Sequence, residues 1–178
     1  MGAAAVTQVD IPPESAVARL YAAPDLADAY AIRLPDDAVA DAEALARFVF
    51  AQPAPWVEGL MRVRDGVVGI FGLKTARQLR AAPAAAGRAA RVGIFKVYAS
   101  SPREVLLGED DKHLDFRLSV LRQARSVGGV VTPWLVVSTT VDCHNRLGRA
   151  YILVIAPFHR QVVQSALRRA ARIGWPQA

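Results

Sequence analysis

The fold of this chain is decided by one long stretch in its second half, HLDFRLSVLRQARSVGGVVTPWLVVSTTVDCHN (113–145). Polar and apolar residues alternate over 113–123 and again over 133–145, which is the period of a β-strand with one buried face. A Gly-Gly loop separates the two runs, and a connection this short requires antiparallel strands, because a parallel crossover needs about a dozen residues or more. The stretch therefore predicts a pair of antiparallel strands.

The same alternation predicts further strands on either side of this pair. They are expected over residues 28–35, 94–100, 104–110 and 149–156. The later strands are joined by the sequences SP, DDK and NRLG, which are rich in residues that favour tight turns. The chain is therefore expected to build an antiparallel sheet.

Helices are expected in three places. The first begins near Asp41, a favourable N-cap, and continues through Val49. The second begins at Pro55, and from Trp56 onward its apolar residues recur at helical spacing. The last starts at Pro157, a residue that suits the first position of a helix.

This order of elements is an α+β layout: one strand, two helices, five strands and a long final helix. The simplest packing wraps a sheet of about six strands around the C-terminal helix. We expect a single domain over 26–174, in which 76–91 is a low-complexity loop. Residues 1–25 are expected to form an N-terminal arm with a short helix after Pro12, and 175–178 a tail.

Composition places the chain among globular proteins: 53% of its 178 residues are apolar and 21% are charged. No apolar run reaches the roughly 18 residues of a membrane helix, and no signal peptide is expected, so we expect a cytoplasmic protein without membrane contact. The net charge of +6 raises the question of nucleic-acid binding. Zinc-finger spacing, aromatic stacking motifs and basic heptads are all missing from the sequence, so nucleic acid is not the expected partner.

The single cysteine, Cys143, is followed by His144 and Asn145, which raises the question of a nucleophilic site. Adjacent residues of a strand point to opposite faces, whereas a nucleophile and its base must lie about 3 Å apart. We therefore expect a hairpin corner at NRLG, in which His144 faces Arg149 and Cys143 faces Ala150. Cys143 is expected to be a small core residue.

Polar residues gather on one face of the predicted strands. They are Ser138, Thr140, Asp142, His144, Arg149 and Tyr151, together with Asp111, His113, Asp115, Arg117 and Ser119. The simpler interpretation is a solvent-exposed outer face with cross-strand ion pairs. The alternative is a metal site built from His113, its two neighbouring aspartates and His144, but charge is expected beside a turn in any case. We therefore expect no metal and no cofactor.

Three segments resemble a bacterial family of unknown function numbered 2867. They are PWVEGLMRVRDGVVGIFGLK (55–74), GEDDKHLDFRLSVLR (108–122) and CHNRLGRAYILVIAPFHRQVVQSALRRA (143–170). That family is similar, more distantly, to the START/polyketide-cyclase (SRPBCC-like) helix-grip superfamily. The resemblance implies an antiparallel sheet that grips the C-terminal helix around an apolar cavity. Because family members also occur behind Rossmann-type reductase domains, it implies a separate reductase of that type as a partner.

The leading hypothesis is a protein that binds an apolar or amphipathic small molecule in a cavity between the sheet and the last helix. The residues expected to contact this ligand are Arg117, His144, Tyr151, His159 and Trp56. The hypothesis rests on the order of elements and on fold-level resemblance.

An enzyme of the cyclase or isomerase type is the first alternative. Its general base would be His159 or His144, and Asp142 or Asp115 would orient that base. Whether the protein is an enzyme is left open by the sequence.

A structural protein with a filled core is the second alternative. An apolar patch at Leu153 and Ile155 would then bind a partner, either a second copy of the chain in a homodimer or the reductase.

Overall fold

The computed structural model describes residues 5–51, 53–57, 59–60 and 91–177. The elements in chain order are β1 (Thr7–Val9), β2 (Leu26–Arg33), α1 (Ala42–Ala51), β3 (Arg91–Val92), β4 (Phe95–Ser100), β5 (Glu104–Asp110), β6 (Leu114–Val127), β7 (Val130–Cys143) and α4 (Arg146–Ile173). Within these residues the strands form one seven-stranded sheet in the order β1-β2-β7-β6-β5-β4-β3, and every pair is antiparallel.

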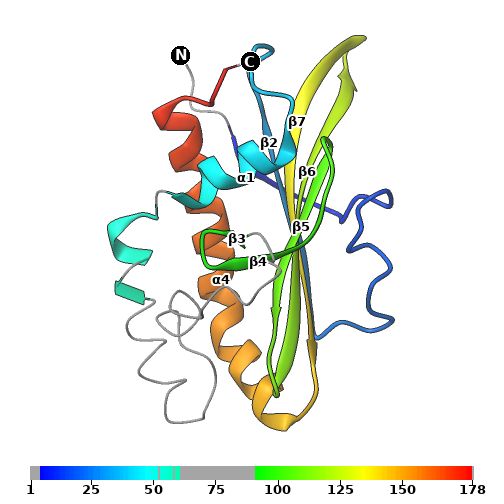
Figure 1. Ribbon diagram of the computed structural model, residues 1–178, viewed down its shortest axis with the longest axis vertical. Helices are drawn as coiled ribbons and strands as arrows, with labels where there is room; N and C mark the ends of the chain where they lie inside the picture. The colour runs from blue at the N-terminus through cyan, green and yellow to red at the C-terminus, as the bar shows by residue number, and fades with distance from the viewer. Residues whose placement is uncertain (1–4, 52, 58, 61–90, 178) are drawn as a thin grey trace, which may run out of the picture.

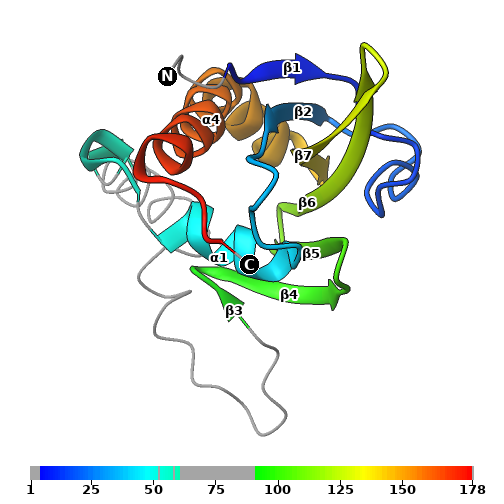
Figure 2. The same cartoon turned by 90° about the horizontal axis from the view of Figure 1, so that it is seen from above.

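The sheet curves around α4, which is clearest when the molecule is seen from above (Figures 1 and 2). This arrangement confirms the expected α+β, helix-grip fold, with seven strands where about six were expected. We call the sheet face that packs against α4 the inner face and the opposite one the outer face.

The two longest strands, β6 and β7, are joined by Gly128 and Gly129 alone, because Val127 pairs directly with Val130. Both glycines have positive φ angles, 60° and 82°. A two-residue hairpin turn of this kind needs positive φ at both positions, which glycine adopts without strain. The strands therefore continue to the turn, beyond the residues at which alternation predicted their ends.

The main core lies between the inner face, α1 and α4. Its fully buried side chains include Val120, Leu135, Leu45 and Leu167, from β6, β7, α1 and α4 respectively. Asp41 caps α1 as expected, because its Oδ1 accepts a hydrogen bond from the Ala44 N–H at 2.7 Å. The burial of apolar side chains from strands and helices together holds the sheet curved around α4.

The predicted strand 149–156 is wrong, since these residues form the first turns of α4. The predicted hairpin corner is a helix start: Asn145 has an extended backbone, and its side chain accepts a hydrogen bond from the Gly148 N–H at 3.0 Å. Pro157 lies inside the helix and does not begin it. The β-branched run in this segment has strand propensity, but capping and packing of one helical side outweigh it.

The N-terminal segment also differs from expectation. The short helix predicted after Pro12 is a series of turns, and Thr7–Val9 adds an edge strand to the sheet. Residues 10–25 lie on the outer face, on the side of the sheet away from α4 (Figure 1). There Glu104 Oε1 of β5 accepts hydrogen bonds from Ser15 Oγ at 2.8 Å and the Ala16 N–H at 2.9 Å. The segment is therefore tied to the middle of the sheet.

Most of the predicted second helix and of the low-complexity loop lies outside the described residues. Residues 55–57 and 59–60 are helical, and Arg91 opens β3. At the other end, Trp175 of the expected tail packs on Phe48 of α1, with ring centroids 6.0 Å apart. In the described part of the chain, no helix has both the length and the apolar character to cross a membrane.

Candidate functional site

Two apolar clusters pack α4 against the inner face, one toward each end of the helix. The first cluster includes Val163 and Leu167, and the second includes Ile152 with Cys143. His159 lies on α4 between these two clusters. The contact between helix and sheet thus changes from apolar to polar near the middle of α4.

His159 meets the carboxylate of Asp28 on β2 at this level. Their Nε2 and Oδ1 atoms lie 3.3 Å apart, and the side chains are 22% and 2% exposed. Because a carboxylate only accepts hydrogen bonds, His159 must donate from Nε2, which leaves Nδ1 as the acceptor in the neutral imidazole. The pair is therefore oriented and largely shielded from solvent.

Further polar atoms surround this pair. Asp28 lies directly opposite Thr139 of β7 in the strand register. Asp28 Oδ2 and Thr139 Oγ1 are buried and find no hydrogen-bond partner within the described residues. Burial, and after it the charge of Asp28, raises the pKa of the Tyr30 hydroxyl, which lies two residues along the same face. These groups form a buried polar set that the described chain leaves partly unsatisfied.

Three half-buried phenylalanines supply an apolar surface on the same side of the sheet. Phe95 of β4 makes edge-to-face contacts with Phe50 of α1 and Phe116 of β6, at centroid distances of 5.4 and 5.8 Å. Phe116 is the next inner-face residue of β6 after Leu118, which pairs with Thr139. Aromatic rings thus lie one residue pair from the polar set.

Comparison with known families decides where the chain belongs. Residues 20–166 match the family described as "Protein of unknown function (DUF2867)". The chain belongs to the DUF2867 family. This confirms the first resemblance that the sequence suggested. No curated protein and no solved structure matches this DUF2867 chain.

Two other predicted ligand-binding residues of the DUF2867 protein lie on the outer face, so the sheet separates them from His159. Arg117 is held at 2.6 Å by Asp110 Oδ1 and stacks 3.8 Å above the Tyr98 ring. His144 Nε2 lies 3.1 Å from Asp115 Oδ2. The Arg117–Asp110 contact is a cross-strand ion pair of the kind expected there, and the His144–Asp115 contact joins the end of β7 to β6.

Part of the outer face is nevertheless buried, where a solvent-exposed face was predicted. Ser119, Ser138 and Thr140 are buried. The N-terminal segment lies over this side of the sheet, and Ser119 Oγ donates to Glu104 Oε1, the same oxygen that holds Ser15. A covering segment distant in sequence could not be read from the alternation of the strands themselves.

The remaining expected residues take separate places. Asp142 pairs with Asp115 in the β6–β7 register and does not approach His159. Tyr151 packs beside the Ile152 cluster at the start of α4, and Trp56 is 46% exposed. Of the predicted ligand-binding residues, the structure therefore places His159 alone within the buried polar set.

Cys143 is a core residue, as expected, although α4 rather than a strand covers it. It packs with Leu114, Val141 and Ile152. Burial, followed by the charge of Asp25, raises the pKa of its thiol to about 12. A thiol with so high a pKa is protonated at neutral pH and does not act as a nucleophile.

The histidines near the β5–β6 turn have protein partners of their own. His113 Nδ1 lies 3.0 Å from Asn145 Nδ2, and His144 pairs with Asp115. No group of three or more potential metal ligands occurs in the part of the chain that the structure describes. The metal interpretation of these residues gains no support from the geometry.

Sequence reasoning missed Asp28, the partner of His159. A signal for it exists in the first strand, LADAYAIR, where Asp28 shares one face with Tyr30 and Ile32. An acidic residue on the otherwise buried face of a strand needs a partner, because a lone buried charge is costly. That observation could have indicated a functional or structural pair before the fold was known.

Proposed function

We propose that this DUF2867 protein binds an apolar or amphipathic small molecule between the inner face of the sheet and α4. The observation that carries the proposal is the Asp28–His159 pair, which lies between two apolar clusters. Buried polar atoms in native proteins nearly always have partners. A ligand that donates a hydrogen bond to Asp28 Oδ2 or Thr139 Oγ1 would supply the partners that the described residues do not.

The surroundings favour a ligand with a hydrogen-bond donor on an apolar body. The polar set offers a carboxylate and a hydroxyl as acceptors, and Phe95 and Phe116 offer aromatic surface nearby. Sites for small molecules commonly combine a mostly apolar wall with a few such polar groups. The position between sheet and C-terminal helix is also the one that the helix-grip resemblance implies.

A second candidate function is an isomerase- or cyclase-type enzyme. The same pair favours it, because an imidazole oriented by a carboxylate is a common general base. In this version His159 takes a proton at Nδ1 and Asp28 stabilises the imidazolium that forms. Asp28 replaces Asp142 and Asp115 as the orienting carboxylate, since both lie on the other side of the sheet.

Native mass spectrometry of the purified protein, beside a denatured control and an organic extract, tests the binding proposal. We expect an extra mass that is released on denaturation. Asp28→Asn should lower the fraction of protein that carries this mass, whereas His144→Gln on the outer face should leave it unchanged. Equal occupancy in wild type and Asp28→Asn would contradict the proposed site.

His159→Gln separates the two functions once the ligand is known. Glutamine retains a polar side chain but cannot take up a proton at neutral pH. If the variant still binds the molecule but no longer converts it, the enzyme is supported. If it loses binding and no conversion is seen in wild type, the protein is a binding module.

The expectation of a homodimer or a reductase partner stays a prediction. Leu153, one of the residues that motivated it, is 78% exposed on α4.

A further inference from the structure

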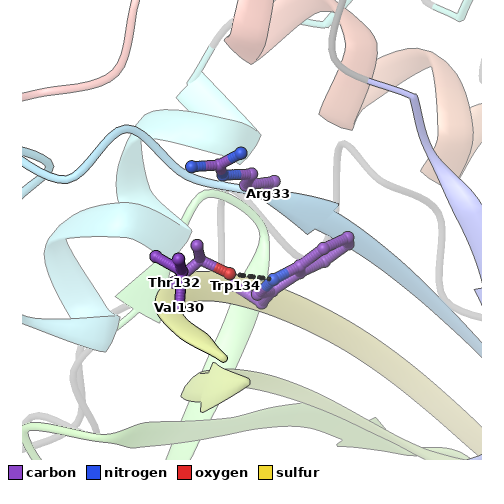
Figure 3. Close-up of a pocket in the computed structure, with 4 residues that line it drawn as sticks. All are labelled: Arg33, Val130, Thr132 and Trp134. Atoms are coloured by element: carbon purple, nitrogen blue, oxygen red, sulfur yellow. Dashed lines mark hydrogen bonds between the residues drawn. The ribbon is translucent and has the colours of Figure 1, made fainter. Parts of the chain in front are cut away.

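A pocket of about 290 Å³ lies on the outer face of the sheet, close to the β6–β7 hairpin. It is lined by Arg33, Val130, Thr132 and Trp134 (Figure 3). Arg33 ends β2, and the other three residues alternate along the first part of β7, so all four side chains belong to one face. The pocket is separated from Asp28 and His159 by the sheet itself.

The indole of Trp134 is held in one orientation. Its Nε1–H donates a hydrogen bond to Thr132 Oγ1 at 2.9 Å, shown by the dashed line in Figure 3. On the β6 side, the guanidinium carbon of Arg125 lies 5.1 Å from the ring centroid, a cation–π contact. A large aromatic ring fixed in this way offers a rigid flat surface to a ligand.

Arg33 places an exposed positive charge at the edge of the pocket. It lies directly opposite Trp134 in the β2–β7 register and is exposed. It makes no hydrogen bond or ion pair with any of the residues that the structure describes, unlike Arg47, Arg117 and Arg149. The four described residues that line the pocket include no acidic side chain. The guanidinium is therefore available to an anion.

We propose that this pocket binds a small planar aromatic carboxylate. The carboxylate pairs with the two parallel N–H donors of Arg33, which match its geometry. The ring of the ligand lies against Trp134 and the exposed side chain of Val130. The two requirements, an anion and a flat apolar body, come from adjacent residues of neighbouring strands, so one small molecule satisfies both.

This site differs from the proposed inner site in the chemistry that it selects. Asp28 and Thr139 offer acceptors and so favour a ligand that donates a hydrogen bond, whereas the Asp28 carboxylate repels an anion. Arg33 calls for an anion. The two proposals are thus independent and either can fail without the other.

The test uses the full ¹⁵N-labelled chain and 2-naphthoate as the probe. The indole N–H resonance of Trp134, assigned by its loss in Trp134→Phe, is followed during the titration. We expect a saturable shift of this resonance, with those of Trp56 and Trp175 unmoved. Arg33→Gln should weaken the affinity for 2-naphthoate by about tenfold, the loss typical of a charge-assisted hydrogen-bonded pair.

Two controls separate the site from general charge attraction. Arg146→Gln removes the same charge from an exposed arginine in the first turn of α4, and the start of α4 lies at the end of the molecule away from the β6–β7 hairpin (Figure 1). This variant should leave the affinity unchanged. The neutral analogue 2-naphthamide, titrated into wild-type protein, should bind about tenfold more weakly than 2-naphthoate, and this comparison does not depend on any variant folding. An unmoved Trp134 resonance, equal effects of the two arginine variants, or equal affinity for acid and amide would overturn the proposal.

Discussion

At the level of single residues, Asp25 joins two parts of the chain that are distant in sequence. Its Oδ2 accepts a hydrogen bond from the Cys143 N–H at 2.7 Å, and its Oδ1 lies 3.1 Å from Arg149 Nε. Burial alone would raise the pKa of Asp25, but the Cys143 N–H and the Arg149 guanidinium together outweigh it and lower the pKa below 3.8. One carboxylate thus fixes the end of the N-terminal segment to the end of β7 and the first turn of α4.

Asp25→Asn is expected to destabilise the fold by about 1–2 kcal/mol at pH 7, with the exposed Arg149 adding little. Because the folded pKa is depressed, the contribution is fully present above the unfolded pKa of about 3.8 and is lost as the pH falls through the lower, folded value. Urea unfolding of both proteins from pH 7 to pH 2 measures this. The difference in unfolding free energy should stay constant down to about pH 5 and shrink below it.

The exposed Asp36 supplies the matched control, because Asp36→Asn removes the same charge without these partners. A constant stability difference at all pH values for Asp25→Asn would show that the charge of Asp25 has no role.

Among the secondary-structure elements, α4 has its starting residue and its distance from the sheet set by contacts of its first turn. Asn145 caps the helix, and Gly148 brings it against the β5–β6 turn, where a Cβ would clash with the carbonyl oxygen of His113. That carbonyl cannot move easily, since it accepts a hydrogen bond from the His144 N–H at 2.9 Å. The absence of a side chain at one position therefore sets how closely helix and sheet approach.

Gly148→Ala should destabilise the protein by about 1–3 kcal/mol, because the added methyl group meets backbone atoms. The sign of the change in unfolding free energy is informative, because alanine in place of glycine would stabilise a helix without such a contact by about 1 kcal/mol. Urea unfolding measures the change, and Ala150→Gly at an exposed position of the same turn measures helix propensity alone. A more stable Gly148→Ala protein would contradict the close contact.

Elements were predictable from sequence to different degrees, for a physical reason that α4 illustrates. The strands β4 to β7 carry mostly apolar side chains on the inner face and more polar ones on the outer face, and this alternation predicted them. Residues 149–156 are apolar on nearly every side, with Ile152 buried but Leu153 and Val154 exposed. A run without clear periodicity does not distinguish a strand from a helix, so only the cap and the packing decide.

In the molecule as a whole, the N-terminal segment covers part of the outer face of the sheet. Glu104 Oε1 accepts hydrogen bonds from Ser15 Oγ, the Ala16 N–H and Ser119 Oγ. This one oxygen atom therefore links β5 to Ser15 and Ala16, which lie 89 and 88 positions earlier in the sequence. Val17 of this segment is itself buried, with 2% of its surface exposed. The buried serines and threonines of the outer face depend on this cover.

Glu104→Ala should release the segment, because it removes the acceptor of three hydrogen bonds. We expect a loss of about 2–3 kcal/mol in unfolding free energy and faster hydrogen exchange of the Ala16 amide. Asp10→Ala, at an exposed position of the same segment, is the control and should change neither quantity. Unchanged exchange at Ala16 in Glu104→Ala would mean that apolar packing of Val17 alone holds the segment.

In both candidate sites, some residues could be picked out from the local sequence, whereas their partners could be found only from the fold. His159 was a candidate from sequence alone because it is a lone histidine on the last helix. Its partner Asp28 lies 131 positions away, and no local pattern joins them. Arg33 and Trp134 are likewise brought together only by the pairing of β2 with β7.

Local sequence patterns were sufficient to predict the α+β class, the antiparallel strands β4 to β7, the first helix with its cap at Asp41, and the core position of Cys143. These follow from periodicity, turn residues and capping, all of which act over a few residues. The tertiary structure alone decided where α4 begins, that part of the outer face is covered, and which acid meets His159. Each of these depends on contacts between distant segments, whose free energy comes from burial and pairing that no short stretch of sequence contains.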